Sequence, residues 1–176
     1  MTELWDVYDQ NRVKTGIMRR GEPVPPGGHR LVVHVCVFNC RGEMLIQQRQ
    51  PFKDGWPNCW DVTVGGCAVA GEASRAAIER ECLEELGYPL EIGDARPSLT
   101  LNFPQGFDDY YIVEREIGPG ALTLQYEEVQ AVRWASKEEI LRLVENGEFV
   151  NYHENLIALL FDLRGCEGAY RREEDL

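Results

Sequence analysis

The stretch that decides the fold is GGCAVAGEASRAAIERECLEELGY, which occupies residues 65–88. Two glycines open it, and from residue 73 to residue 86 apolar side chains recur at helical spacing. Gly87 follows, and glycine commonly ends a helix because it adopts the left-handed conformation without strain. The predicted helix therefore buries one apolar stripe, made by Ile78, Cys82 and Leu86, with Ala76 and Leu83 at its edge.

The opposite side of this helix carries three acids. At about 100° per residue, Glu81, Glu84 and Glu85 fall on an arc of about 100°. Like charges three and four positions apart repel one another, and a shared cation relieves the repulsion. Carboxylate oxygens on a rigid face suit Mg²⁺ or Mn²⁺, which also accept phosphate oxygens as ligands. The pattern predicts either a metal site or, more plainly, a solvated acidic face.

Neighbouring residues favour the metal site. The pair Gly65–Gly66 lets the backbone approach a ligand or the helix start. Arg80 lies beside the acids, and a guanidinium can hold a carboxylate through two hydrogen bonds. Glu72 stands just before the helix. These neighbours indicate a functional site rather than a solvated face.

The same stretch resembles the signature of the Nudix family. The fixed positions of that signature are filled in register over residues 66–88 by Gly66, Glu72, Arg80, Glu81, Glu84, Glu85 and Gly87. Cys82 and Tyr88 stand where the family has bulky apolar residues, which is a mild departure. The chain is thus similar to Nudix hydrolases at every fixed position.

The resemblance implies an α+β fold, an αβα sandwich with a mixed β-sheet and a catalytic loop–helix–loop. It implies Mg²⁺, with Mn²⁺ as a substitute, bound by the carboxylates of Glu81, Glu84 and Glu85, often with the carbonyl of Gly66. Glu81 would also activate the attacking water, and Glu72 would support the site directly or through Arg80. Metal polarises the bridging phosphates and lowers the pKa of bound water. The implied substrate is a small-molecule diphosphate.

The wider chain resembles Nudix proteins related to isopentenyl-diphosphate isomerase. This likeness covers about residues 3–145 and rests on WDVYDQNRVKTG, the HR before the first core strand, FNCRGEMLIQQR, WDVTVGG, and the spacing of Arg49, Lys53, Pro57 and Trp60. The isomerase's reactive cysteine would align with Gly65, and its metal-binding histidine with Cys67. Without a proton donor and acceptor across the alkene, isomerisation has no evident chemistry. The isomerase stays as an alternative.

Outside the helix the sequence predicts mostly strands. An N-terminal hairpin is expected over about residues 3–20, and a buried central strand over residues 31–38, which are nearly all apolar. Ser136 and Glu139 form a capping-box pattern that starts a helix running to about residue 146. A last helix is expected over about residues 153–163. Further strands are predicted at residues 43–49, 60–64, 99–103, 110–116 and 129–134. One mixed sheet with a few helices, in a single domain over residues 1–176, follows.

Two cations are candidate phosphate contacts. Arg49 and Lys53 begin the loop after a core strand. In so acidic a chain local cations are informative, although surface charges are the plain alternative. Glu128, with Glu127 beside it, is a candidate for an extra carboxylate of the kind that some family members supply. These residues predict a substrate pocket beside the acidic helix.

The segment LNFPQGFDDYY, residues 101–111, offers candidates for recognising a base. Phe107 could stack on one, as could Phe103, Tyr110 or Tyr111, although core packing explains aromatics in a strand equally well. Asp109, like Asp108, could select a base edge or add a metal ligand, and exposed loop acids are the alternative. His34 lies in an alternating strand and is expected to be packed rather than catalytic.

Composition limits the classes of function. The 176-residue chain has a formal net charge of −12, which disfavours binding to a nucleic-acid polymer. No apolar run approaches the roughly 18 residues of a membrane-spanning helix, and the N-terminus lacks the pattern of a signal peptide. The six cysteines include no CxxC pair, so free thiols are expected rather than a structural zinc site. A cytoplasmic location is the expectation.

Three functions remain to be separated. The first is metal-dependent hydrolysis of a phosphoanhydride bond in a nucleoside-diphosphate-linked or related diphosphate compound. The second is a non-catalytic, ligand-sensing Nudix domain, which the intact acids disfavour. The third is the isomerase. Whether the chain pairs into a homodimer is left open, although many similar proteins do.

Overall fold

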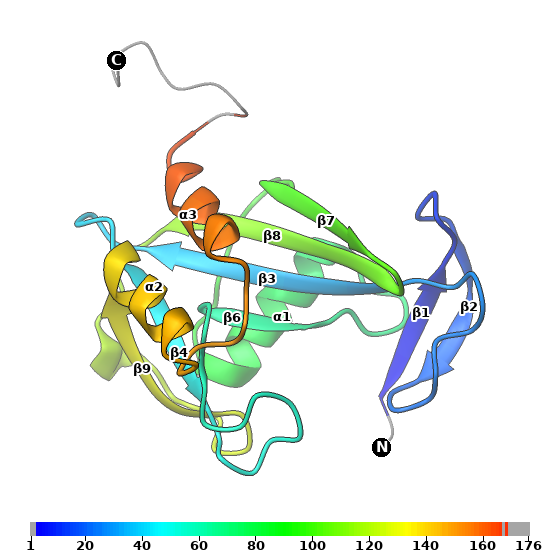
Figure 1. The fold of residues 1–176 in the computed structure, drawn as a ribbon. Helices are drawn as coiled ribbons and strands as arrows, with labels where there is room; N and C mark the ends of the chain where they lie inside the picture. Colours follow the sequence, from blue (N-terminus) through cyan, green and yellow to red (C-terminus); the bar gives the residue numbers. More distant parts are fainter. Residues whose placement is uncertain (1–2, 167, 169–176) are drawn as a thin grey trace.

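The computed structural model describes residues 3–166 and 168, which form nine strands, three α-helices and one short 3-10 helix (Figure 1). The strands are β1 (Leu4–Tyr8), β2 (Lys14–Arg19), β3 (Arg30–Phe38), β4 (Met44–Arg49), β5 (Trp60–Asp61), β6 (Val64–Cys67), β7 (Leu99–Phe103), β8 (Gly106–Glu114) and β9 (Val129–Ala135). The helices are α1 (Ser74–Leu86), α2 (Lys137–Glu145) and α3 (Glu154–Asp162), and the 3-10 helix is η1 (Pro119–Ala121).

Strand β3 is the centre of a seven-stranded mixed sheet. One of its edges pairs in parallel with β8 over the whole strand. Its other edge is shared by two antiparallel partners, β6 near the start and β4 at Phe38. Strands β5 and β9 extend the sheet beyond β4, and β7 extends it beyond β8. Burial on both faces explains why β3 is almost entirely apolar in sequence.

Helices cover both faces of this sheet. In Figure 1, α1 lies behind the sheet, whereas α2 and α3 lie in front of it. Side chains of β3 alternate between the two layers: Val33 and Val35 join the core cluster of α1, whereas Cys36 and Phe38 join the cluster of α2 and α3. The predicted α+β fold, an αβα sandwich with a mixed sheet, is therefore confirmed.

The N-terminal hairpin forms a separate two-stranded sheet at one end of the main sheet (Figure 1). Contacts to β3 and to the loop before α1 attach one end of it. Tyr8 pairs with His29 as an isolated bridge, the Ala70 amide donates to the Leu4 carbonyl, and the Asp6 carboxylate accepts from the Gly71 amide at 2.8 Å. The hairpin is thus attached directly to the loop that leads into α1.

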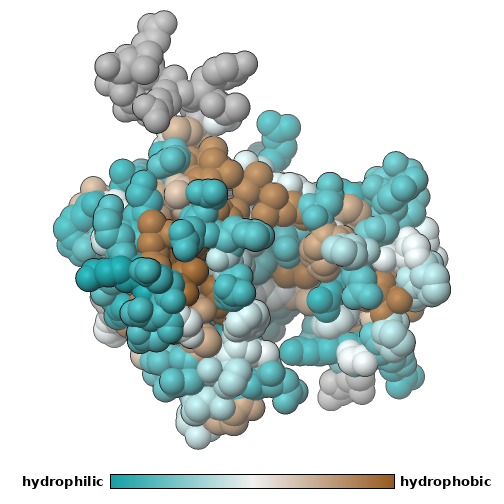
Figure 2. Space-filling model, viewed as in Figure 1, coloured by the Kyte–Doolittle hydropathy of each residue, from teal (hydrophilic) through white to brown (hydrophobic). Residues whose placement is uncertain are grey.

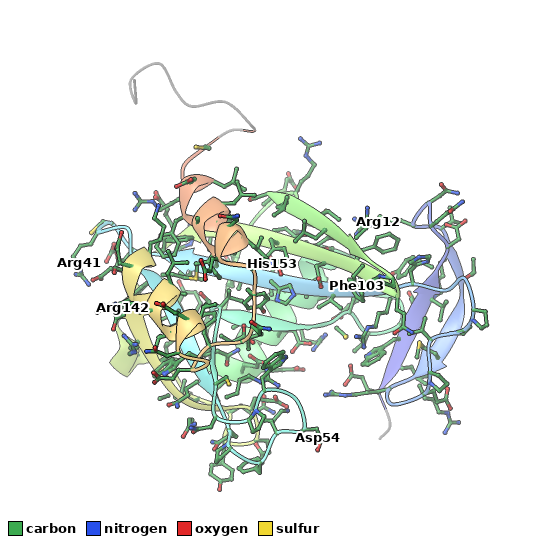
Figure 3. All side chains as sticks on the ribbon, viewed as in Figure 1. Arg12, Arg41, Asp54, Phe103, Arg142 and His153 are labelled. Carbon is green, nitrogen blue, oxygen red and sulfur yellow. The ribbon has the colours of Figure 1, made fainter. Side chains whose placement is uncertain are left out.

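The far end of the hairpin is attached through its turn. Arg12 donates two hydrogen bonds to the buried Asp109 of β8, at 3.0 and 2.6 Å. Arg12 and Phe103 lie at the same end of the sheet, where the hairpin meets β7 and β8 (Figure 3). The turn therefore contacts the main sheet through a bidentate ion pair. The Asp109 carboxylate of this pair is buried, whereas the Arg12 side chain is partly exposed.

Three details differ from the sequence expectations. The strand predicted at residues 60–64 is two short strands, and the Gly65–Gly66 pair lies inside β6 rather than after a strand, because β6 pairs with β3. Strand β8 begins at Gly106, earlier than expected. On α1 the apolar stripe includes Ala77, whereas Leu83 is 54% exposed, because the sheet covers only one side of the helix.

The surface in Figure 2 is mostly hydrophilic, with hydrophobic residues gathered over α3. Leu159 of this helix is 40% exposed, whereas Ile157 and Leu160 are buried against the sheet. Within residues 3–166 and 168, no helix has both the length and the apolar character needed to cross a membrane.

Candidate active site

The two ends of helix α1 are set by capping residues, and its acidic side faces a pocket. Ala73 is the extended N-cap residue, and Gly87 adopts the left-handed conformation with φ 62°. The Gly87 and Tyr88 amides then donate to the last carbonyls of the helix, which is a Schellman-type ending. With Ile78, Cys82 and Leu86 facing the sheet, the acidic side turns toward β6.

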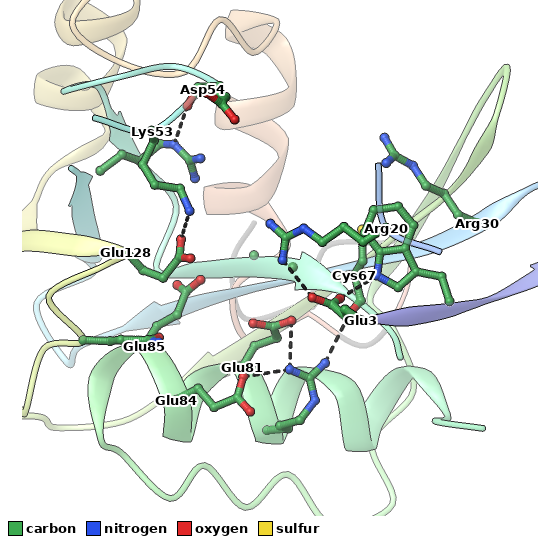
Figure 4. A pocket seen from close by; sticks show the side chains of 17 residues that line it. Glu3, Arg20, Arg30, Lys53, Asp54, Cys67, Glu81, Glu84, Glu85 and Glu128 are labelled. Atoms are coloured by element: carbon green, nitrogen blue, oxygen red, sulfur yellow. Dashed lines mark hydrogen bonds and ion pairs between the residues drawn. The ribbon is translucent and has the colours of Figure 1, made fainter. Parts of the chain in front are cut away.

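A pocket of about 470 Å³ lies over this side of α1. Most of the residues predicted for the site line it: Gly66, Arg80, Glu81, Glu84, Glu85, Arg49, Lys53 and Glu128. Figure 4 shows Glu81 and Glu84 on α1, with Lys53 and Glu128 on one side and Glu3 and Arg20 on the other. The pocket therefore has an acidic floor between two walls that carry cations.

Arg80 is the hub of the acidic floor. Its guanidinium holds Glu72 with two hydrogen bonds, at 2.8 and 3.0 Å, and also donates to the Cys67 carbonyl. The Nη1 atom contacts Glu84 at 2.9 Å and Glu81 at 3.1 Å. Glu72 does not line the pocket, so its contact with the site runs through Arg80, while its carboxylate also accepts from the Val69 amide.

Glu81 lies against the backbone of Gly66. A Cβ atom on residue 66 would lie 2.2 Å from Glu81 Oε1, so a side chain there is excluded unless Glu81 moves. Burial raises the pKa of Glu81 to about 7, although the neighbouring Arg80 opposes this shift. A carboxylate with such a pKa can exchange a proton near neutral pH.

Glu85 is the most buried of the three acids, at 6% exposure. Burial and the nearby charge of Glu81 raise its pKa to about 8, and a hydrogen bond from Gln47 opposes the shift. The Gln47 Nε2 atom donates to Glu85 Oε2 at 3.0 Å. A buried carboxylate of this kind is held in a fixed direction but is costly to ionise without a cation.

The residues present fit a hard divalent cation. Carboxylate oxygens from one rigid helix line the same pocket as Gly66, where the absence of a side chain leaves room for the Glu81 carboxylate. The arrangement carries its own counter-charge, since Arg80 lies against Glu81 and Glu84. Within the described part of the chain, no three Asp, Glu, His or Cys side chains are arranged to hold a metal ion as they stand. For all three acids to hold one ion, Glu84, whose side chain is half exposed, would have to turn from Arg80.

One wall of the pocket comes from the loop after β4. Lys53 contacts Glu128 at 2.5 Å, and Arg49 donates to the Gly55 carbonyl at 3.0 Å. Arg49 also lies 3.8 Å from the buried Asp61. Both candidate phosphate contacts therefore face the pocket, each with a partner that a phosphate group would compete with.

The other wall comes from the N-terminal hairpin and the start of β3, which the sequence did not indicate as part of the site. Glu3, Trp5, Arg20 and Arg30 line the pocket. Glu3 accepts hydrogen bonds from the Trp5 indole and from Arg20, which hold the pKa of its carboxyl low against the opposing effect of burial. No local motif marks these residues, because their position depends on how the hairpin attaches to the main sheet.

Two predicted substrate residues lie elsewhere. Phe107 is buried in the α1 core cluster and stacks on His29, and Asp109 is 1% exposed and is occupied by Arg12 and Thr100. Neither lines the pocket, because β8 faces them into the interior and toward the hairpin turn. Tyr110 is likewise buried, stacked on His34 with ring centroids 4.5 Å apart, so that histidine is packed as expected.

Cys67 lines the pocket beside Gly66. Burial raises the pKa of its thiol to about 11, so the side chain is neutral at physiological pH and is a poor nucleophile. The position that would carry the isomerase's reactive cysteine is Gly65, whose missing Cβ leaves room for the His34 ring.

The chain is similar to known proteins over most of its length. The model of the NUDIX domain matches residues 28–160. An uncharacterized Nudix hydrolase of Listeria monocytogenes is 44% identical over 165 residues, covering 93% of this chain and 96% of that protein. An isopentenyl-diphosphate Delta-isomerase of Salmonella arizonae is 34% identical over 113 residues, covering 60% of this chain and 61% of that protein.

The fold is shared with a solved structure as well. The crystal structure of DR0079 from Deinococcus radiodurans superposes with a TM-score of 0.72 at 24% identity, covering 90% of this chain and 97% of that one. The matched family model includes the central strand, the acidic helix, all of α2 and most of α3. The chain therefore belongs to the Nudix hydrolase family, whose members hydrolyse pyrophosphate-containing compounds with the help of divalent metal ions.

Proposed function

We propose that this enzyme hydrolyses a phosphoanhydride bond in a small nucleoside-diphosphate-linked or related diphosphate compound, with Mg²⁺ as the metal and Mn²⁺ as its substitute. The observation that carries the proposal is the pocket itself, in which three carboxylates of one helix lie between walls bearing Lys53 and Arg20. Cations on both sides suit a substrate that is anionic on both sides of the bond to be cut.

In this proposal Glu81, Glu84 and Glu85 are the metal ligands, together with the carbonyl of Gly66. A divalent ion held there would neutralise phosphate charge and activate water. Arg80 orients Glu81 and is itself fixed by Glu72. The Oε1 atom of Glu81 lies 3.1 Å from Arg80 Nη1, and we assign the other oxygen, Oε2, as the atom that accepts the proton of the attacking water.

Two exposed aromatic rings, next in sequence to residues that line the pocket, support a substrate with a nucleobase. Phe52 and Tyr126 are 56% and 71% exposed, and their ring centroids lie 5.8 Å apart. Phe52 directly precedes Lys53, and Tyr126 lies two residues before Glu128. Lys53 and Glu128 form an ion pair. Exposed aromatic rings beside phosphate-binding cations suit a planar base, and they replace the buried aromatics of β8 as the stacking candidates.

The isomerase is the second candidate, because similar proteins include isopentenyl-diphosphate isomerases. Its chemistry needs a proton donor and acceptor across an alkene. Glycine stands at the position of the reactive cysteine, and Cys67 at that of the metal-binding histidine. The residues therefore favour hydrolysis.

A panel of diphosphates incubated with Mg²⁺ tests the proposal. The panel contains nucleoside diphosphates, nucleotide sugars, dinucleoside polyphosphates and isopentenyl diphosphate, and the products are resolved by chromatography and phosphorus NMR. We expect release of phosphate or a nucleoside monophosphate. Rearranged isoprenoid product would contradict hydrolysis in favour of isomerisation, and tight binding of a panel member without turnover would indicate a ligand sensor.

A further inference from the structure

Gln47 is buried beneath the acidic floor and lies outside the stretch 65–88 that carries the three acids. It lies on β4, where its Cα is in register with Asp61 of β5 and Val132 of β9. Its exposure is 3%, and Leu45, two positions earlier on the same face, packs in the core cluster of α1. The strand therefore directs an amide side chain toward the helix that carries the three acids.

The amide has one partner. Its Nε2 atom donates to Glu85 Oε2 at 3.0 Å, and this is the only hydrogen bond that the Glu85 side chain makes among the described residues. The Oε1 atom of Gln47 is buried and has no hydrogen-bond partner within the same part of the chain. Glu85 is thus held through one oxygen by a side chain whose other end is unsatisfied.

This half-satisfied amide argues against a purely structural role. A buried polar atom without a partner costs about 1–3 kcal/mol, so an apolar side chain of similar size would serve the core better. What the amide contributes, and an apolar side chain could not, is the hydrogen bond to Glu85. Residues that orient a metal ligand through a hydrogen bond commonly affect metal affinity by about 10–100-fold.

We propose that Gln47 is a positioning residue that fixes the Glu85 carboxylate for metal binding. It holds Glu85 Oε2, while Glu85 itself lines the pocket and its Oε1 makes no hydrogen bond within the described residues. The inference rests on the proposed function, in which Glu85 is a metal ligand, and it adds a residue from a strand outside the acidic helix to the metal site.

The test compares Gln47→Met with Gln48→Met. Methionine matches the length of glutamine and removes the donor with little change in volume. Gln48 is the matched control, because it is adjacent on β4 but donates to the Asn58 carbonyl, away from the acids. The dissociation constant for Mn²⁺ is measured by electron paramagnetic resonance, without substrate, and thermal unfolding verifies that each variant is folded.

We expect the Mn²⁺ dissociation constant of Gln47→Met to rise by about 10–100-fold, with that of Gln48→Met within about twofold of the parent. Gln47→Leu, which also removes the donor, should lose affinity too and serves if the methionine variant does not fold. At saturating metal, KM for the diphosphate should be unchanged. Parental Mn²⁺ affinity in both Gln47 variants, or an equal loss in Gln48→Met, would overturn the proposal.

Glu85→Gln separates this inference from the proposed function. If Glu85→Gln loses Mn²⁺ affinity while the Gln47 variants keep it, Gln47 has no positioning role and the metal assignment stands. If Glu85→Gln binds Mn²⁺ as tightly as the parent does, Glu85 is not a ligand, and both proposals fail at that residue.

Discussion

Single residues decide the charge balance of the pocket. Arg80 lies among three glutamates, so its cation offsets part of their mutual repulsion, and Glu85 is paired with a neutral amide only. The acids therefore differ in their surroundings: Glu84 is half exposed and paired with Arg80, whereas Glu85 is buried. Each difference leads to a separate prediction.

Glu84→Gln should reduce kcat by about 100-fold or more, because one charged ligand oxygen is lost where charge develops in the reaction. The fold should persist, since the substitution relieves repulsion among acids on one helix. Steady-state kinetics and thermal unfolding measure both effects. Glu145→Gln, at an exposed glutamate of α2, is the control and should match the parent. Parental kcat in Glu84→Gln would show that this residue is not a ligand.

Glu85 should make the metal-free protein less stable as the pH rises. Its folded-state pKa, about 8, lies above the ordinary value of 4.5. Its contribution to the free energy of unfolding is therefore full below about pH 4.5 and is lost as the pH rises through about 8. Urea unfolding in EDTA across this range should show a decline in the parent that is smaller in Glu85→Gln. The same decline in both proteins would contradict the burial argument.

At the scale of elements, α1 and β6 depend on each other. Burial of Glu81 against β6 requires glycine at residue 66, while Gly87 ends the helix that carries Glu81. The helix was predictable from sequence to within a residue at its start, because apolar spacing and a terminal glycine are local signals. The pairing of β6 with β3 was not predictable, because the partners are far apart in sequence.

Gly66→Ala tests this dependence. The added Cβ would lie 2.2 Å from Glu81 Oε1, so the carboxylate must move, and kcat should fall by about 10-fold or more. Gly16→Ala is the control, since it also lies in a strand and its Cβ would meet nothing within 4 Å. Metal-dependent kinetics of the two variants provide the comparison. Equal activity in both would mean that Glu81 need not occupy its observed position.

At the scale of the whole molecule, residues of the N-terminal hairpin complete the pocket that the stretch 65–88 only begins. Sequence reasoning located the acids, Arg49, Lys53 and Glu128, because each stands in a motif or beside a core strand. It placed Phe107 and Asp109 in the pocket as well, whereas β8 turns them toward the interior and Arg12. Which side of a strand faces a ligand depends on tertiary pairing, and this information is absent from local patterns.

Arg12→Gln should loosen the hairpin. It removes both hydrogen bonds to Asp109 and leaves a buried carboxylate with Thr100, so the free energy of unfolding should fall by about 1–3 kcal/mol. Because the hairpin carries Arg20 to the pocket, KM should rise more than kcat falls. Urea unfolding and kinetics measure these effects, with Arg19→Gln, an exposed arginine of β2, as the control. An unchanged KM would show that the hairpin wall does not contact substrate.

The central claim is that Glu81, Glu84 and Glu85 together hold the metal on which hydrolysis depends. Anomalous diffraction from crystals containing Mn²⁺ and a non-hydrolysable diphosphate tests this most directly. We expect an anomalous peak in contact with oxygens of all three glutamates and with the diphosphate. A peak bound to other residues, with Arg80 still paired to Glu81 and Glu84 while the diphosphate occupies the pocket, would contradict it.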